Sequence, residues 1–254
     1  MSGNVRIIAR LDIKGPNVVK PVQADALRVV GNPKEFAEKY YRQGIDEIFY
    51  LDIVASLYQR SIDFDMLKDV CRTIFVPVTV GGRIRSVEDI QNILASGGDK
   101  VAINTYAIEN PHFLSLAVRE FGAQCIVLSI EALKLGDNKW EALTEGGRQK
   151  TGVDVVEWAK KAIDLGVGEI LLTSIERDGT RKGFDIELVK SITKFAHVPV
   201  VAHGGAKNPE SVLEVIVKGK ADAVSISSIF HYDAYTTTSI KEYLNTNGVP
   251  VRFT

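Results

Sequence analysis

The sequence contains very little cysteine. Cys71 and Cys125 are the only two among its 254 residues, and neither has a second cysteine or a histidine at metal-ligand spacing. This cysteine usage argues against a disulfide framework and against a zinc site. We therefore expect a protein of a reducing compartment that holds no structural metal.

The sequence also lacks an excess of charge of either sign, and it has no long apolar run. It carries 31 Lys and Arg against 32 Asp and Glu, so its net charge gives no argument for a nucleic-acid partner. No run approaches the roughly 18 apolar residues of a membrane-spanning helix. The first residues have no apolar signal-peptide core. The composition predicts a cytoplasmic protein that binds neither nucleic acid nor membrane.

Short apolar runs alternate with amphipathic segments along the entire chain, which is typical of repeated βα units and a parallel sheet. The pattern predicts strands near residues 5–12, 46–53, 75–80, 99–104, 125–131, 168–175, 198–203 and 222–227. It predicts helices near residues 33–43, 63–73, 86–96, 111–121, 153–165, 185–195, 208–218 and 237–246. Three of the helices have a capping asparagine directly before a first-turn proline, namely Asn32, Asn110 and Asn208.

Eight such units favour a closed (β/α)8 TIM barrel over an open sheet, because that fold takes about 250 residues. A Gly-x-Gly-x-x-Gly turn after the first strand would indicate a dinucleotide-binding fold, and it is missing. Two connections, residues 13–31 and 132–152, are longer than the fold requires. We expect them to be long functional loops. Each follows a strand that ends in a carboxylate, Asp12 or Glu131.

The sequence also repeats itself at a spacing of about 122 residues. Val76-Pro77-Val78 corresponds to Val198-Pro199-Val200, and Gly81-Gly82 corresponds to Gly204-Gly205. The repeat predicts one domain, residues 1–254, built from two homologous half-barrels at about 1–124 and 125–254. Asp12 and Glu131 would then face each other across the mouth of the barrel.

Asp12 is the first candidate for chemistry. A charge at the end of a buried strand is costly unless it is paired or used, and catalytic residues of barrels lie at the carboxyl ends of the strands. Lys20, in the following loop, is the second candidate. A structural salt bridge between Asp12 and Lys20 is the alternative.

Each half carries glycines and small polar residues at the ends of its third and fourth strands. Such residues let a phosphate approach the backbone and donate hydrogen bonds to it at helix N-termini. We expect two phosphate sites and hence a bisphosphate substrate. The residues are Gly81, Gly82, Asn104 and Thr105 in the first half and Gly204, Gly205, Ser227 and Ser228 in the second. Asp178-Gly179 is either a plain turn or a ligand contact beside the second site.

Four charged residues stand where barrel strands begin, a place that is usually apolar or neutral. They are Arg6, Glu47, Lys100 and Glu169. Two positive and two negative side chains near one opening could form a closed salt-bridge ring. The residues alone leave open whether it is a solvated rim network or a functional gate.

Over essentially its whole length the chain resembles the cyclase subunit of imidazole glycerol phosphate synthase, a half-barrel-duplicated TIM barrel. The segments that carry the resemblance include Leu11-Asp12-Ile13-Lys14, Leu51-Asp52-Ile53, Ile103-Asn104-Thr105, Arg177-Asp178-Gly179-Thr180 and Phe230-His231.

The resemblance implies a reaction. The family takes ammonia from a partner glutaminase and splits a phosphoribulosyl-formimino derivative of aminoimidazole carboxamide ribotide, releasing imidazole glycerol phosphate and the ribotide. It implies that Asp12 is the principal acid/base, that Glu131 is the second, and that Lys20 lies in a mobile loop. It also implies that the four-residue ring is an ammonia gate and that no metal or organic cofactor is needed.

Five residues depart from the family pattern. Arg10 replaces a cysteine that is usual in the family, and Glu131 replaces an aspartate. Arg83 and Pro21 each replace a glycine, and His203 replaces a small residue. Because most of these changes lie at the catalytic face, a second hypothesis is a divergent paralog associated with surface-glycan biosynthesis. Such a paralog would pass ammonia from a glutaminase to a separate sugar amidotransferase. A third reading, a non-enzymatic scaffold that activates its glutaminase, is disfavoured by the retained Asp12 and phosphate residues.

Overall fold

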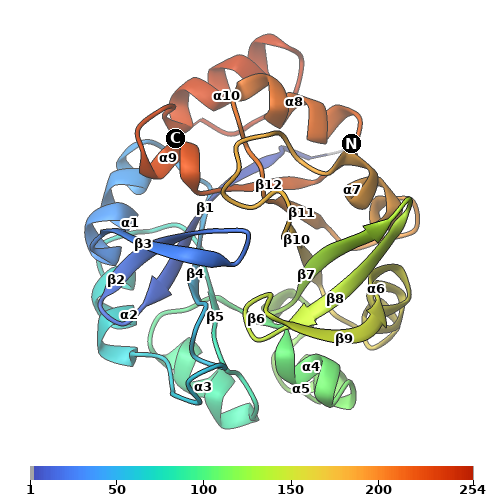
Figure 1. The fold of residues 1–254 in the computed structure, drawn as a ribbon. Helices are drawn as coiled ribbons and strands as arrows, with labels where there is room; N and C mark the ends of the chain where they lie inside the picture. The colour runs from blue at the N-terminus through green and yellow to red at the C-terminus, as the bar shows by residue number, and fades with distance from the viewer. Residues whose placement is uncertain (1–2, 254) are drawn as a thin grey trace.

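The computed structural model describes residues 3–253 and contains a closed barrel of eight parallel strands (Figure 1). The strands are hydrogen-bonded in the order β10-β11-β12-β1-β4-β5-β6-β7, and β7 pairs with β10 to close the barrel. This confirms the predicted (β/α)8 TIM barrel. The barrel strands are β1 (Arg6–Lys14), β4 (Glu47–Asp52), β5 (Val78–Gly81), β6 (Lys100–Ile103), β7 (Ile126–Gly136), β10 (Glu169–Ser174), β11 (Val200–His203) and β12 (Ala223–Ile226).

Helices surround the barrel, and they lie near the predicted positions. The long ones are α1 (Pro33–Arg42), α2 (Phe64–Cys71), α3 (Val87–Ala95), α5 (His112–Phe121), α6 (Val155–Asp164), α7 (Ile186–Thr193), α8 (Pro209–Val217) and α10 (Thr237–Thr246). The short helices α4 (Thr105–Glu109), α9 (Ser228–His231) and η1 (Ala123–Cys125) were not predicted. Among residues 3–253, no helix is long and apolar enough to cross a bilayer.

Two of the three predicted asparagine caps are present. The Asn32 side chain accepts hydrogen bonds from the first turn of α1, and Asn208 forms a capping box with Ser211 in α8. The third prediction was wrong, because α5 begins after Pro111 without a side-chain cap. The unpredicted helix α4 accounts for this, since Asn110 lies at the carboxyl end of α4 and not at the start of a helix.

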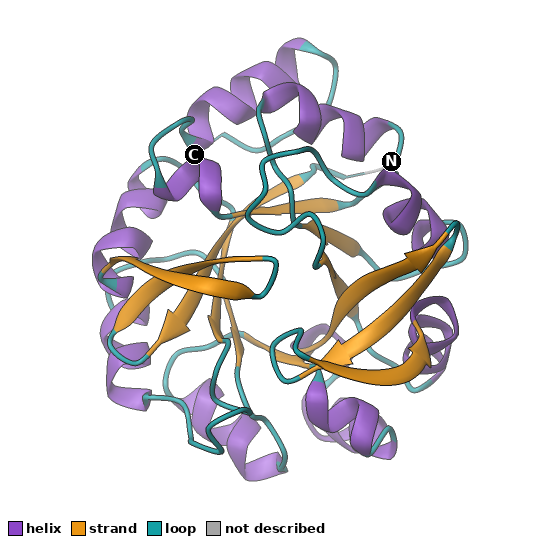
Figure 2. Ribbon diagram, viewed as in Figure 1, coloured by secondary structure: helices purple, strands orange, loops and turns teal. Residues whose placement is uncertain are grey.

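The two long connections are β-hairpins and not loops, which corrects the prediction for 13–31 and 132–152. Strands β1 and β7 run past the barrel and turn back into antiparallel strands, which lie across its front in Figure 2. The added strands are β2 (Asn17–Val22), β3 (Asp25–Gly31), β8 (Lys139–Thr144) and β9 (Gln149–Asp154). Extended pairing gives the backbone of these segments partners, which an irregular loop over the barrel mouth would lack.

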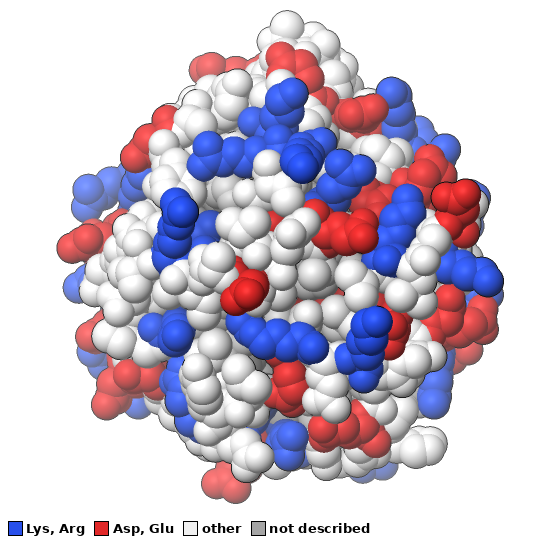
Figure 3. Space-filling model, viewed as in Figure 1, with Lys and Arg blue, Asp and Glu red and all other residues white. Residues whose placement is uncertain are grey.

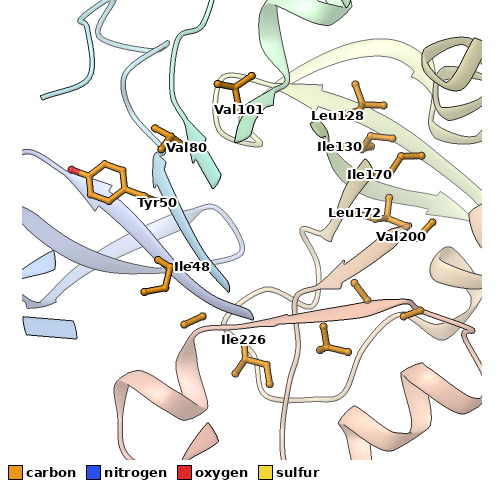
Figure 4. Close-up of a cluster of buried hydrophobic side chains, with 14 of the residues drawn as sticks. Ile48, Tyr50, Val80, Val101, Leu128, Ile130, Ile170, Leu172, Val200 and Ile226 are labelled. Carbon is orange, nitrogen blue, oxygen red and sulfur yellow. The ribbon is translucent and has the colours of Figure 1, made fainter. Parts of the chain in front are cut away.

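Alternation along the strands separates two apolar layers. One set of side chains points away from the barrel axis and packs against the helices; Figure 4 shows part of it, including Ile48, Val80 and Leu172. The other set forms a smaller buried cluster inside the barrel, made of Ile8, Phe49, Leu51, Ala102, Val127, Leu171, Val201 and Ala223. The interior is therefore apolar at mid-height, with polar residues left to its two ends.

We propose that this single domain of residues 1–254 consists of two half-barrels that meet near residue 124. The structure repeats at that spacing in its accessory elements as well as in its strands. Hairpins extend β1 and β7, and the short helices α4 and α9 follow β6 and β12. These repeated accessory elements support the half-barrel interpretation of the sequence repeat.

Candidate active site

Two pockets lie at the carboxyl ends of the strands, and between them they contain all the residues expected to bind phosphate. The first has a volume of about 600 Å³ including its open mouth, and its lining includes Gly81, Gly82, Asn104 and Thr105. The second is smaller, about 210 Å³ including its open mouth, and its lining includes Asp178, Gly179, Gly204, Gly205, Ser227 and Ser228. The structure thus brings each predicted set together.

Glycine is required in these pockets by backbone packing. A Cβ on Gly82, whose φ is +137°, would lie 2.9 Å from the Cβ of Asp52. A Cβ on Gly204, whose φ is +98°, would lie 2.6 Å from the carbonyl oxygen of Ser174. A side chain at either position would meet both strain and a clash. The pockets consequently expose main chain along their walls, which suits an anionic ligand.

Asp12 lies inside the barrel in contact with two cations. Oδ1 accepts a hydrogen bond from Arg10 Nε at 2.7 Å, and Oδ2 lies 3.5 Å from Lys20 Nζ. Arg10 also donates from Nη1 to Thr173 Oγ1 at 3.1 Å. Since Asp12 is 0 % exposed, its carboxylate is completely covered by these neighbours. The salt bridge that the sequence left as an alternative to chemistry is therefore present.

Lys20 lies in strand β2 of the first hairpin and is buried, which corrects its expected place in a loop. Its Nζ lies 2.9 Å from Asp178 Oδ1, at the turn that follows β10. The hairpin is held on that turn by the Gln23 backbone amide, which donates to the Asp178 carbonyl at 3.0 Å. Lys20 thereby connects the Asp12 carboxylate to the edge of the second pocket.

Glu131, at the same height on β7, has a different environment. It accepts a hydrogen bond from Asn104 Nδ2 at 3.0 Å, and no ion pair joins it to a described residue. It lines the first pocket and also a small central cavity that Arg10, Thr173 and Asp178 share. Of the two predicted catalytic carboxylates, Glu131 is the one that faces open space.

The two carboxylates also differ in protonation. Burial alone raises the pKa of Asp12, but the charges of Arg10 and Lys20 outweigh it and hold the pKa below its ordinary value. Burial raises the pKa of Glu131 to about 7, although the positive charge of Arg10 acts to lower it. Near neutral pH, Asp12 is therefore an anion while Glu131 exchanges readily between its two protonation states.

His203 is a further residue of the second pocket, noted from the sequence only as a departure from the family. Its Nδ1 lies 3.0 Å from the carbonyl oxygen of Ser225, and its Nε2 lies 3.3 Å from Asp178 Oδ1. Burial lowers the pKa of His203, with Arg10 acting in the same direction and Asp178 against it.

Other lining residues were either missed or left undecided by sequence reasoning. Asp52, buried at the end of β4, lines the first pocket and pairs with Arg60 at 2.7 Å. Its place at a strand end is the same signal that identified Asp12. Arg83 also lines the first pocket, and its backbone is left-handed, with a φ of +47°. Its buried Nε has no hydrogen-bond partner within residues 3–253, so it is placed to serve an anionic ligand.

The four charged residues at the strand starts form the closed ring that the sequence suggested. Arg6 pairs with both Glu47 and Glu169, and Lys100 Nζ lies 3.0 Å from Glu47 and 2.8 Å from Glu169. Thr79 Oγ1 donates a further hydrogen bond to Glu47 at 2.6 Å. The ring occupies the amino-terminal ends of the strands, and the inner apolar cluster separates it from the carboxylates.

No group of three or more His, Cys, Asp or Glu side chains in the described part of the chain is arranged to hold a metal ion. On the face that carries the two hairpins, basic and acidic side chains are interspersed, as Figure 3 shows. This face presents no broad field of one sign.

Comparison with known proteins gives two results. The family described as histidine biosynthesis protein matches residues 6–236. The chain is also similar to the imidazole glycerol phosphate synthase subunit HisF of Legionella pneumophila, with 55% identity over 202 residues, which is 80% of this chain and 95% of that protein. The chain therefore belongs to the histidine biosynthesis protein family and, within it, to the HisF subunits.

Proposed function

We propose that this chain is the cyclase subunit of an imidazole glycerol phosphate synthase in histidine biosynthesis. It uses ammonia to convert the phosphoribulosyl-formimino derivative of aminoimidazole carboxamide ribotide into imidazole glycerol phosphate and the free ribotide. The observation that carries the proposal is the position of Glu131, in a central cavity between two pockets with phosphate-binding equipment. The 55% identity to a HisF subunit supports the same function.

The geometry suggests how a long bisphosphate substrate would lie. One phosphate occupies the first pocket, against Gly82, Thr105 and the free Nε of Arg83. The other occupies the second pocket, against the backbone of Gly204 and the hydroxyl of Ser228. The reacting middle of the substrate then crosses the central cavity beside Glu131.

Glu131 carries the proton transfers in this proposal. Ammonia addition, imine loss and ring closure all move protons, and a group with a pKa of about 7 can both give and accept them at neutral pH. Asp12 acts as a fixed anion that orients Arg10 and Lys20. Lys20 fixes the positions of the Asp12 and Asp178 carboxylates relative to each other through its two ion pairs.

The partner in the proposal is a glutaminase docked at the amino-terminal end of the barrel. Ammonia released there meets the ring of Arg6, Glu47, Lys100 and Glu169, which acts as a gate when an ion pair opens. Beyond the ring, the apolar interior holds few groups that could protonate the neutral molecule. Ammonia would thus reach Glu131 in its reactive form. The reaction takes place in the cytoplasm, as the composition predicts.

The test of the proposal bypasses the partner. Purified protein is mixed with the formimino bisphosphate and excess ammonium at alkaline pH, and loss of substrate is followed. Turnover that disappears in Asp12→Asn and Glu131→Gln but persists in Asp69→Asn, an exposed aspartate on α2, is the expected result. Absence of turnover in the wild-type protein contradicts the proposal. The comparisons and the geometry do not favour the alternative role in nucleotide-sugar amidination.

A further inference from the structure

The second pocket contains two buried polar atoms that are left without a hydrogen-bond partner among the described residues. They are Nε2 of His203 and Oγ of Ser225, on side chains that are 3 % and 1 % exposed. Both residues line the pocket. An unsatisfied buried polar atom is unfavourable, so two of them facing one small cavity indicate a ligand whose binding completes their hydrogen bonds.

The protonation pattern of His203 follows from its neighbours. The Ser225 carbonyl oxygen, 3.0 Å from Nδ1, can only accept a hydrogen bond, so we assign the proton of the neutral ring to Nδ1. Nε2 then directs a lone pair at Asp178 Oδ1, which is 3.3 Å away and is itself an acceptor. A proton on Nε2 converts this acceptor pair into a charge-assisted hydrogen bond.

The charges around His203 keep that proton off while the pocket is empty. Burial lowers the pKa of the ring, and Arg10 on β1 and Lys20 on β2 act in the same direction, against Asp178 after β10. Arg181 also lines the pocket. A phosphate group brings close to two negative charges at neutral pH. When the phosphate lies beside the His203 side chain, these charges favour the protonated form of its imidazole, the imidazolium.

We propose that His203 takes up a proton when a phosphomonoester enters the second pocket, and that the imidazolium then bridges Asp178 and the phosphate. The proton comes from solvent and no covalent bond forms or breaks. The inference deepens the proposed function, on which it rests for the identity of the ligand as one end of the bisphosphate substrate. It makes His203 a determinant of specificity for the dianionic phosphate.

The bridge resolves an electrostatic conflict. Asp178 is an anion, because the charge of Lys20, whose Nζ lies 2.9 Å from Oδ1, and that of Arg10 outweigh the effect of burial and lower its pKa. Its carboxylate lines the same pocket as the phosphate, so without a proton on His203 two anions would face each other across a small cavity. The proton placed between them removes that repulsion, and phosphate affinity becomes dependent on pH.

The test uses glycerol 3-phosphate as the probe. The chain has four histidines, so ¹⁵N-histidine labelling gives few ring signals, and the signals missing from His203→Gln identify His203. We expect saturation with the probe to change this ring from the one-proton to the two-proton nitrogen pattern at pH 7. His112→Gln, at an exposed site on α5, serves as the matched control.

Affinity supplies the second measurement. Between pH 7 and 8.5 the phosphate remains mostly dianionic. We expect wild-type affinity to fall on the order of tenfold over this interval, the scale of one charge-assisted hydrogen bond. His203→Gln should bind more weakly at pH 7 and show little pH dependence. His203→Ser, with a small residue at this site, provides a second variant if the first does not fold.

The outcomes separate this inference from the proposed function. A His203 ring that stays in the one-proton pattern at saturation overturns the inference, as does probe affinity that is equal in the wild-type protein and His203→Gln, or absent in both. Proton uptake without turnover of the formimino substrate supports the role of His203 and counts against the cyclase. Turnover without proton uptake does the reverse.

Discussion

Arg10 Nε donates a hydrogen bond to Asp12 Oδ1 over 2.7 Å, within the barrel and two positions apart on one strand. Residues at i and i+2 of a strand share a face, so the strand itself keeps the Arg10 guanidinium beside the Asp12 carboxylate. It holds the carboxylate in its anionic form and separates it from the central cavity, which Arg10 itself lines. In the proposed function the principal acid/base role therefore belongs to Glu131, and not to Asp12 as the resemblance implied.

Arg10→Met should raise the pKa of Asp12. The substitution keeps much of the side-chain length but removes the strongest charge that opposes the effect of burial. Arg10 also lowers the pKa of Glu131, the group that sets the acid limb of the pH profile of ammonium-dependent kcat/KM, so we expect that limb to move to higher pH by about one unit. Arg119→Met, at an exposed site on α5, should leave the profile unchanged. An unmoved acid limb in Arg10→Met would mean that the charge of Arg10 does not control the carboxylates of this site.

Glu131→Asp should slow the reaction, although aspartate is the usual residue of the family. The shorter side chain withdraws the carboxylate from Asn104, which donates to it at 3.0 Å, and from the central cavity. A misplacement of about 1 Å can cost on the order of 100-fold in rate. Steady-state kcat with ammonium measures the effect, and Glu157→Asp, which is exposed on α6, is the control. Equal or faster turnover in Glu131→Asp would show that the site does not require the longer side chain of glutamate.

Glu131 should also make the stability of the fold depend on pH. Its pKa is raised from an ordinary 4.5 to about 7, so the native state binds a proton more tightly than the unfolded chain does. Its contribution to stability is present below pH 4.5 and is lost as the pH rises to about 7. Over that interval the free energy of unfolding should fall by up to about 3 kcal/mol relative to Glu131→Gln, which does not titrate.

Urea unfolding of the wild-type protein and Glu131→Gln at pH 5 and pH 8 measures this difference. Glu157→Gln, whose side chain is 72 % exposed, should follow the wild-type protein at both values. Parallel pH dependence in the wild-type protein and Glu131→Gln would contradict the raised pKa.

Lys100→Ala tests the gate. The substitution leaves Glu47 and Glu169 paired with Arg6 and opens one side of the ring. We expect turnover with glutamine, measured in the complex with the glutaminase, to change several-fold more than turnover with free ammonium. Lys68→Ala, a partly exposed residue on α2, is the control. Equal losses with both nitrogen sources would identify the ring as a structural network.

The barrel and most of its helices could be predicted because their signals are local. Apolar alternation identifies a strand, a 3.6-residue period identifies a helix, and an asparagine before proline identifies a helix start, as at Asn32 and Asn208. The hairpins were missed because strand pairing depends on a partner segment. Asn110 was misassigned because a five-residue helix, α4, is too short to have a periodicity of its own.

The sequence by itself determined most of the residues that reach the site. The repeat and the strand ends identified Asp12, Glu131 and the two phosphate sets, because a barrel gathers the carboxyl ends of its strands at one face. Only the tertiary structure decided what those residues can do. Lys20 meets Asp178 across 158 positions of chain, and the pKa of Glu131 depends on how deeply the hairpins and strands bury it. Contacts between distant segments set charge and protonation, and no local pattern encodes them.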